Sequence, residues 1–436
     1  MIARLLAILL VMAPSAANAV PARPETVSDL GAPWSPDLGD PVLADLLVRA
    51  ELGSLDLKMA LARLERASAD VDLTRAGRRP HLTIGAEVAA GGGDFSSVRS
   101  GAGIPVQGGY EVDMFGRLKH GQQAAVADEA ASLQDAAGVR RQVLAAVAHA
   151  YIALRAAQAH QAAAEVLTPL AVQVSDLIRR RQADGAATGA EVGAAWAQEN
   201  ETRAELQRAT HAVEAERARL GILLGLDAPI DEPAYAGDEI PPTPAVTTVS
   251  SEAVLARADI LGAQARLRAA DARRAEAVAT SRPRFILTAG IGSGDADLLY
   301  LLDVRALAWA VAGGITHELL DGGAAKARQR GAVADATLAE LAYRKAVGGA
   351  WGQARLALAT LQDATTTETL ARERWRRDVV AFGTGLTRHR DGDIDGVALA
   401  ALEVRAAGAD TALADAQAAR AQAYIDLSLA LGGGVP

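Results

Sequence analysis

The stretch Arg79-Pro80-His81-Leu82-Thr83-Ile84-Gly85 returns later in the chain as Arg282-Pro283-Arg284-Phe285-Ile286-Leu287-Thr288. Further pairs of similar segments stand on both sides of it, all about 203 to 207 residues apart. A repeat at nearly constant spacing indicates one architecture built twice. Each half, residues 20–228 and 246–436, is predicted to hold a helix, two strands and two long helices joined by a turn. Residues 229–245, rich in proline and acidic residues, form the predicted linker.

Strand-like alternation follows the repeated stretch. Within residues 81–90 every second side chain is apolar, and residues 106–114 and 307–318 show a similar period of two. About ten alternating residues per strand is the pattern of a membrane β-barrel wall. A half-buried sheet of a soluble protein alternates in the same way, so the strands alone leave both interpretations open. In the membrane interpretation the lipid-facing residues are Leu82, Ile84, Val88, Tyr110, Val112, Leu307, Trp309 and Val311.

The number of strands has a consequence of its own. Four strands per chain cannot close a barrel, and hydrocarbon does not tolerate an open sheet edge. Strands of this kind in a membrane therefore require several copies of the chain around one shared barrel. Residues 91–103 and 293–303, rich in glycine, serine and aspartate, are predicted to be the loops between paired strands.

Long helices fill most of the remaining sequence. Residues 119–181 have a helical pattern with one internal proline, Pro169, where a bend is expected. Residues 324–381 contain no proline and would form a helix of ~90 Å at ~1.5 Å per residue. Alanine dominates its sides, which favours close antiparallel packing. Such helices predict a tube or a rod. A coiled-coil spacer also fits the helices, but the signal peptide and paired strands weigh against it.

Composition and the N-terminus limit the class of protein. Residues 1–19 combine a positive start, an apolar run and the cleavage pattern Ala17-Asn18-Ala19, which predicts a signal peptide rather than an ordinary N-terminal helix. The chain has no cysteine, so acylation of a cysteine is excluded. No later run of apolar residues is long enough for a membrane helix. The net charge of -9 and the absence of a basic patch argue against binding to nucleic acid.

Three segments carry a family resemblance. They are Tyr110-Glu111-Val112-Asp113-Met114-Phe115-Gly116-Arg117, Arg257-Ala258-Asp259-Ile260 and Leu429-Ala430-Leu431-Gly432-Gly433-Gly434. In their order and spacing they resemble motifs of the TolC/OprM/NodT group of outer-membrane efflux proteins, over essentially the whole mature chain. Two departures stand out: Ala258 replaces a proline of the family, and the lipidated cysteine that many relatives carry is absent.

The resemblance implies an architecture and partners. It implies a homotrimer whose strands form one twelve-stranded barrel in the outer membrane of a Gram-negative bacterium, continued by a long α-helical barrel through the periplasm. The implied partners are a periplasmic adaptor and an inner-membrane pump, of the resistance-nodulation-division type from the OprM/NodT-like motifs. The implied function is that of a passive exit duct for small molecules, with no cofactor.

The resemblance also implies that the far ends of the helix pairs form the periplasmic entrance. The first pair is predicted to turn near Gly185, and the second between Phe382 and Asp395. Gly185, Gly383 and Gly385 are the candidate adaptor contacts, although glycines in a turn can simply permit a positive φ. The candidate gate residues are Glu191, Arg388, Arg390, Asp391, Asp393 and Asp395.

The segment Asp391-Gly392-Asp393-Ile394-Asp395-Gly396 has a second interpretation. It matches the opening of a calcium loop, but its twelfth position is Leu402 instead of a bidentate glutamate. The three aspartates are therefore a weak divalent-cation candidate, and capping of a helix start explains them equally well. No other metal site is predicted.

Other classes remain as alternatives. The sequence carries no nucleotide-binding loop and no nucleophile–base constellation, so an enzyme is not expected. A channel for type I protein secretion would use a similar chain. A soluble periplasmic helical scaffold is the alternative from a different class.

Overall fold

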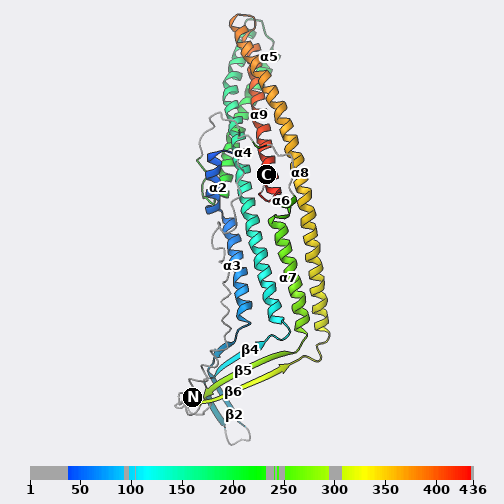
Figure 1. Ribbon diagram of the computed structural model, residues 1–436. Helices are drawn as coiled ribbons and strands as arrows, with labels where there is room; N and C mark the ends of the chain where they lie inside the picture. Colours follow the sequence, from blue (N-terminus) through cyan, green and yellow to red (C-terminus); the bar gives the residue numbers. More distant parts are fainter. Residues whose placement is uncertain are drawn as a thin grey trace.

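The computed structural model describes residues 38–92, 98–103, 105–231, 240, 243–244, 251–293 and 307–433. The molecule is long and narrow, with a sheet at one end and two helical turns at the other (Figure 1). The predicted signal peptide and most of the predicted linker lie outside the described residues. Within the described residues, no helix combines the length and the apolar character needed to cross a membrane.

Two helical hairpins of equal size form the shaft. Helices α4 (Arg117–Ala183) and α8 (Ala324–Arg390) have 67 residues each, or ~100 Å at ~1.5 Å per residue. Helices α5 (Gly189–Leu223) and α9 (Gly396–Ala430) return from their far ends and have 35 residues each. Helix α4 continues without a break through Pro169. Each position of the first hairpin thus has an equivalent 207 residues later.

Shorter helices accompany the two long ones. They are α2 (Pro41–Gly53), α3 (Leu55–Ala76), α6 (Ser251–Leu255) and α7 (Ala258–Thr280). Near the sheet, α3 packs on α4, α4 on α7, and α7 on α8. Near the far end, α5 packs on α4, α4 on α9, and α9 on α8 (Figure 1). The helices thus form one row near the sheet and another near the far end, and α8 is the last helix of both rows.

The core is thin and rich in alanine. Its bulky members lie at mid-height, where α2 covers α4 and where α9 ends. Leu43, Leu46, Leu144, Ile152 and Ile425 are fully buried there. Elsewhere the contacts between helices are made mainly by alanines such as Ala269 and Ala409, which permit close approach of the backbones. Such packing suits a narrow rod, in which Tyr151 and Tyr424 at mid-height are the buried aromatic residues of the core among the described residues.

Four antiparallel strands form the sheet, in the order β1-β4-β5-β6. Their bounds are β1 His81–Ile84, β4 Val106–Val112, β5 Arg284–Ser293 and β6 Leu307–Thr316. The strands β2 (Glu87–Gly92) and β3 (Val98–Gly103) pair separately with each other. Both edges of the main sheet, β1 and β6, are without a partner strand among the described residues.

Two details of the strand prediction are wrong. The predicted strand over residues 81–90 is interrupted at Gly85, and the predicted loop over residues 91–103 contains β3. The interruption has a local cause: Pro105 has no N–H to continue the ladder, and only its carbonyl oxygen is used, accepting from Gly85 N at 2.9 Å.

Candidate functional site

One face of the four-stranded sheet is predominantly apolar. The register aligns Ile84, Val106, Ile291 and Trp309 in one row across the strands, and Val112, Phe285 and Ile315 in another. Paired residues of antiparallel strands lie on the same face of a sheet. The side chains of Leu82 and Ile84 are each 75% exposed, and those of Trp309 and Val311 71% and 70%. A monomer therefore presents an uncovered apolar surface.

The register groups most of the predicted lipid-facing residues. Leu82, Ile84, Tyr110, Val112, Trp309 and Val311 all share the apolar face, with Tyr110 and Val112 half-buried. Leu307 lies in β6 at an alternate position to Trp309 and Val311, and Val88 lies in β2. The side chains of both residues are outside the described part of the structure. The opposite face carries small or polar residues, among them Gln107, Gly109, Thr288, Gly290, Ala310 and Gly314.

The junction between β4 and α4 explains the motif at residues 110–117. Arg117 donates two hydrogen bonds to Glu111, from Nε to Oε1 at 3.0 Å and from Nη2 to Oε2 at 2.7 Å. The Asp113 carboxylate accepts from the free N–H groups of Leu118 and Lys119 at the start of α4. Gly116 has φ +76° and allows the sharp change from strand to helix. These residues fix the direction of the shaft relative to the sheet.

The two tips at the far end have the same geometry. In the first, Gly185 N donates to Gln182 O and Ala186 N to Arg181 O, with Gly185 at φ +74°. In the second, Gly392 N donates to His389 O and Asp393 N to Arg388 O, with Gly392 at φ +83°. Both are helix ends of the Schellman type, closed by a glycine in the left-handed conformation.

The prediction that Gly383 and Gly385 form the second turn is wrong. Helix α8 continues past both glycines to Arg390, and Gly392 holds the position equivalent to Gly185. Gly385 is buried, and a Cβ there would lie 2.4 Å from Leu402 Cδ1 of α9. Its lack of a side chain permits close packing of α8 on α9. At Gly383 a Cβ would meet nothing within 4 Å.

The predicted gate residues are divided between capping and ion pairing. The Glu191 carboxylate accepts from the backbone N–H and hydroxyl of Thr188, which lowers the pKa of Glu191. Asp395 caps α9 through Ala398 N at 2.8 Å and accepts a hydrogen bond from Arg181 Nη2, also at 2.8 Å. The bond from Arg181 and the capping bond hold the pKa of Asp395 below its ordinary value.

The other aspartate and arginine candidates lie around the same turn. Arg388 Nε is 3.9 Å from Asp393 Oδ2, a loose ion pair between exposed groups. Arg390 ends α8 and Asp391 caps it. Within the described ranges, no three acidic or histidine side chains converge as metal ligands would. Capping and pairing with arginine account for Asp395, whereas the calcium-loop pattern has no counterpart in this geometry.

Sequence reasoning missed the side chains that join α9 to α8 within the second repeat and to α4 of the first repeat. Two buried carboxylates of α8 each accept from an arginine of α9: Glu368 from Arg420 at 2.6 Å and Asp378 from Arg405 at 2.7 Å. On the other side of α9, His149 and His160 of α4 lie 2.9 Å and 2.8 Å from Asp426 and Asp415. The partners are far apart in sequence, so no local pattern could reveal them.

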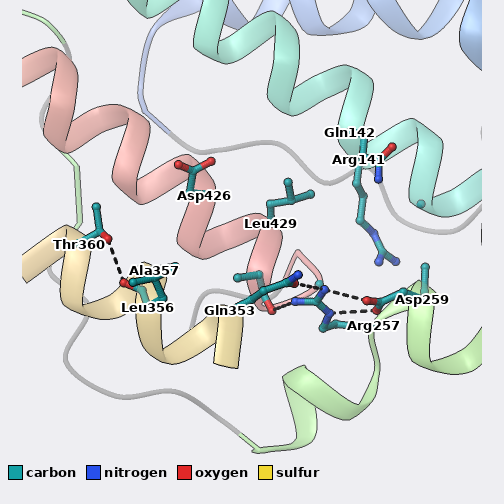
Figure 2. Close-up of a pocket in the computed structure, with 14 residues that line it drawn as sticks. Arg141, Gln142, Arg257, Asp259, Gln353, Leu356, Ala357, Thr360, Asp426 and Leu429 are labelled. Carbon is teal, nitrogen blue, oxygen red and sulfur yellow. Dashed lines mark hydrogen bonds and ion pairs between the residues drawn. The ribbon is translucent and has the colours of Figure 1, made fainter. Parts of the chain in front are cut away.

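A cavity of about 530 Å³ lies at mid-height between α4, α7, α8 and α9 (Figure 2). Arg257 makes two hydrogen bonds with Asp259, at 3.0 and 2.8 Å, and others with Gln353 and Ala430 O. This explains the motif Arg257-Ala258-Asp259-Ile260: the arginine ties the start of α7 to α8 and to the end of α9. Ala258 is the first residue of α7, a position where proline is also favourable.

Paired helical hairpins on an apolar-faced sheet define a class of membrane-associated, elongated proteins, and comparison with known proteins identifies the family. The chain matches the family model for outer membrane efflux proteins over residues 46–226 and 249–433. The chain belongs to this outer membrane efflux protein family, whose members are TolC-type channels. The relatives are channel proteins rather than enzymes.

Individual relatives agree along the whole chain. The outer membrane protein OprJ of Pseudomonas aeruginosa is 28% identical over 420 residues, which cover 92% of this chain and 86% of OprJ. The solved structure of the outer-membrane channel OprN has a TM-score of 0.78 at 25% identity and covers 96% of both chains. The open-state channel MtrE of Neisseria gonorrhoeae also gives 0.78 at 25% identity, covering 90% of this chain and 89% of MtrE.

These relationships establish the class, location and general role. The chain is an outer-membrane protein with the mostly helical fold of these channels, and it serves as an exit channel of an efflux system. The prediction from the sequence is confirmed at this level. Relatives of this kind are outer-membrane components of efflux pumps.

Proposed function

We propose that three copies of this chain form one passive duct across the outer membrane and the periplasm. The observation that carries the proposal is that the sheet and both sets of side-by-side helices end in an edge with no neighbouring element in the same chain, among the described residues. The main sheet ends at β1 and β6, and the helical rows end at α8 on one side and at α3 or α5 on the other. Equivalent open edges on opposite sides favour head-to-tail association that closes into a ring.

The membrane part of the duct is the sheet. With four strands from each copy, a trimer has twelve strands and no open edge, as hydrocarbon requires. The uncovered apolar face supports contact with lipid through Leu82, Ile84, Tyr110, Val112, Leu307, Trp309 and Val311. Val88, in the separate β2–β3 pair, is proposed to face lipid as well. Residues 20–228 and 246–436 are then two tandem structural repeats behind a signal peptide, residues 1–19, and are joined by the linker 229–245.

The helical tips form the proposed periplasmic gate. Charged residues gather at the two tips of each protomer: Arg181, Glu191, Arg388, Arg390, Asp391, Asp393 and Asp395. In a trimer they would ring the entrance, and the Arg181–Asp395 pair would hold the two hairpins of each copy together. Gly185 of the first tip is a proposed adaptor contact, and Gly392 takes the place of Gly383 and Gly385 in the second.

The proposed partners are a periplasmic adaptor and an inner-membrane pump of the resistance-nodulation-division type. The pump would supply the energy, because this chain carries no nucleotide-binding motif. The names of relatives, such as the toluene efflux pump protein TtgF of Pseudomonas putida, support small molecules as cargo. Cargo selection then belongs to the pump. Secretion of whole proteins would need the same duct and is the alternative cargo class.

The mass of the detergent-extracted particle tests the duct. We expect a homotrimer that leaves the membrane fraction only with detergent, measured by light scattering coupled to size exclusion. A particle that is extracted without detergent, whatever its number of copies, would contradict contact between lipid and the apolar face. That outcome would favour a periplasmic scaffold instead.

A further inference from the structure

The edge helices α5 and α8 carry opposite charge at the same height above the tips. Glu201 lies about 12 residues, or ~18 Å, from the start of α5, and Arg376 about 14 residues, or ~21 Å, from the end of α8. Both helices approach the same end of the molecule, where the tips are joined by the Arg181–Asp395 pair. Levels along the two helices can therefore be compared directly.

The acidic side is a cluster on α5. Glu201 and Glu205 both accept hydrogen bonds from a single arginine, Arg208, whose Nη2 lies 2.8 Å and 2.6 Å from their carboxylates. Two carboxylates share one guanidinium, so the cluster keeps an excess negative charge. The buried stripe of α5 in this region, which includes Ala209 and Val213, faces α4. Glu201 is exposed and lies off that stripe.

The basic side is the segment of α8 from Arg372 to Arg377. Two of its arginines are already engaged with buried carboxylates, Arg372 with Glu368 and Arg374 with Asp378. Arg376 has no hydrogen bond or ion pair within the described part of the chain. Arg377 donates only to a backbone oxygen, that of Glu373. This leaves two exposed, unneutralised guanidinium groups on α8.

The unneutralised arginines lie away from the protomer's own packing. The buried residues Leu361, Ala364, Glu368, Asp378 and Gly385 form the stripe of α8 that faces α9. At ~3.6 residues per turn, Arg376, Val380 and Gly383 lie on the side of α8 opposite Asp378 and Gly385, the buried residues at the same height. Val380 is exposed, and nothing lies near Gly383. This side is an open edge of the helical row.

We propose that the acidic cluster of α5 in one copy pairs with Arg376 and Arg377 of α8 in the next copy, and so locks the seam between protomers. This inference rests on the proposed ring of copies and specifies its contact near the periplasmic end. The occupant is a second copy of this chain, because the opposite charges stand at matching heights on opposite open edges.

Cysteine cross-linking tests the seam, since the natural chain contains no cysteine. The Glu201→Cys/Arg376→Cys variant, treated with a short bismaleimide in membranes, should give dimer and trimer bands on a denaturing gel. The matched control is Glu201→Cys/Arg355→Cys, whose second cysteine is exposed on α8 but ~30 Å further from the tip. The control should remain a monomer band. A link within one chain would leave the mass unchanged and would also overturn the proposal.

Charge reversal supplies a second, independent measurement. Glu201→Arg/Glu205→Arg should raise the monomer fraction in detergent about fivefold, from the loss of two exposed ion pairs per seam. Adding Arg376→Glu/Arg377→Glu to the same chain should restore the oligomer, because the pairs re-form with reversed sign. If the oligomer were lost only because the new arginines repel Arg208 within α5, changes on α8 could not restore it. Restoration of the oligomer therefore supports the seam, and failure of the rescue contradicts it.

The results separate the two proposals. An oligomer of natural mass that gives no cross-linked bands would overturn the α5–α8 seam and leave the ring of copies standing. A protein that is monomeric in detergent in its natural form would overturn both. Cross-linking of the Arg376→Cys position to a different protein, in place of a second copy, would assign this surface of α8 to another partner and contradict the seam.

Discussion

Arg181 Nη2 lies 2.8 Å from Asp395 Oδ2, although 214 residues separate them in the chain. The pair joins the end of α4 in the first hairpin to the start of α9 in the second. Asp395 also caps α9, so the same carboxylate holds a helix end and the neighbouring hairpin. The two tips of a protomer are thereby fixed relative to each other.

Arg181→Ala should loosen this connection and raise the conductance of the channel in planar bilayers severalfold. Arg180→Ala is the matched control, since Arg180 stands in the same last turn of α4 without an ion pair in the described structure. The low pKa of Asp395 means that the pair is present at neutral pH and is lost as pH falls through that pKa. Natural channels should therefore also open on strong acidification. Equal conductance of both variants would contradict the role of the pair.

His160 should make stability depend on pH. The hydrogen bond with Asp415 raises the pKa of His160, so the stabilising contribution is complete below the unfolded pKa of about 6.5 and is lost as pH rises through the folded pKa. His160→Gln should therefore lower the thermal midpoint more at about pH 5.5 than at about pH 8.5. The expected cost at low pH is up to ~1 kcal/mol for a partly exposed pair. A cost that is independent of pH would contradict this.

Glu368 should be among the most sensitive positions of the shaft. Burial alone would raise its pKa, but hydrogen bonds from Arg420 and Arg372 outweigh it and hold the pKa below the ordinary value. Glu368→Ala leaves Arg420 without its carboxylate in a half-buried site and should cost about 3 kcal/mol in urea unfolding followed by circular dichroism. Glu373→Ala, on the exposed side of the same helix, should cost less than about 0.5 kcal/mol.

Two glycines of the second tip should respond to alanine with opposite signs. Gly392→Ala places a side chain at φ +83° and should destabilise the protein by about 1 kcal/mol. Gly383→Ala lies inside α8 with free space around its Cβ and should stabilise it by up to ~1 kcal/mol. Denaturant midpoints of the two variants measure this directly. If Gly383→Ala destabilised the protein, that result would contradict a helical position for Gly383 and would support its place in the turn.

The two faces of β6 should differ in their tolerance of charge. Val311→Arg on the apolar face should cost ~2–4 kcal/mol if that residue stands at the middle of the bilayer, and should reduce the amount of oligomer in outer membranes. Ala310→Arg, one residue away on the opposite face, should insert normally. Equal insertion of the two variants, measured by quantitative immunoblotting of membrane fractions, would contradict contact between lipid and this face.

The sequence was most informative where pattern and structure share a period. Alternation correctly grouped Leu82, Tyr110 and Trp309 on one face, since each strand turns its side chains alternately and the register preserves the order. The duplication also predicted two equal hairpins. It did not predict β3, because the glycine-rich composition of residues 98–103 is equally typical of a loop.

The second tip shows why composition can mislead. Gly383 and Gly385 suggest a turn, yet the α8 backbone stays helical because Gly385 packs against Leu402 of α9. The turn belongs to Asp391 and Gly392, the equivalents of Asp184 and Gly185, but the neighbouring aspartates drew attention to cation binding instead. The pairs Arg181–Asp395 and Arg420–Glu368 depend on tertiary contact, which no local signal encodes.

The equal lengths of the two hairpins restrict how this chain can evolve. Both outgoing helices have 67 residues and both returning helices 35, and the tips they carry are bonded to each other. An insertion of about seven residues into α4 alone would raise one tip by ~10 Å and tear Arg181 from Asp395. A longer shaft, for example to span a wider periplasm, therefore requires insertions of equal length in α4, α5, α8 and α9. Proteins that descend from this chain should therefore change the length of the shaft by whole helical turns in all four helices together. Single substitutions, in contrast, can accumulate one at a time.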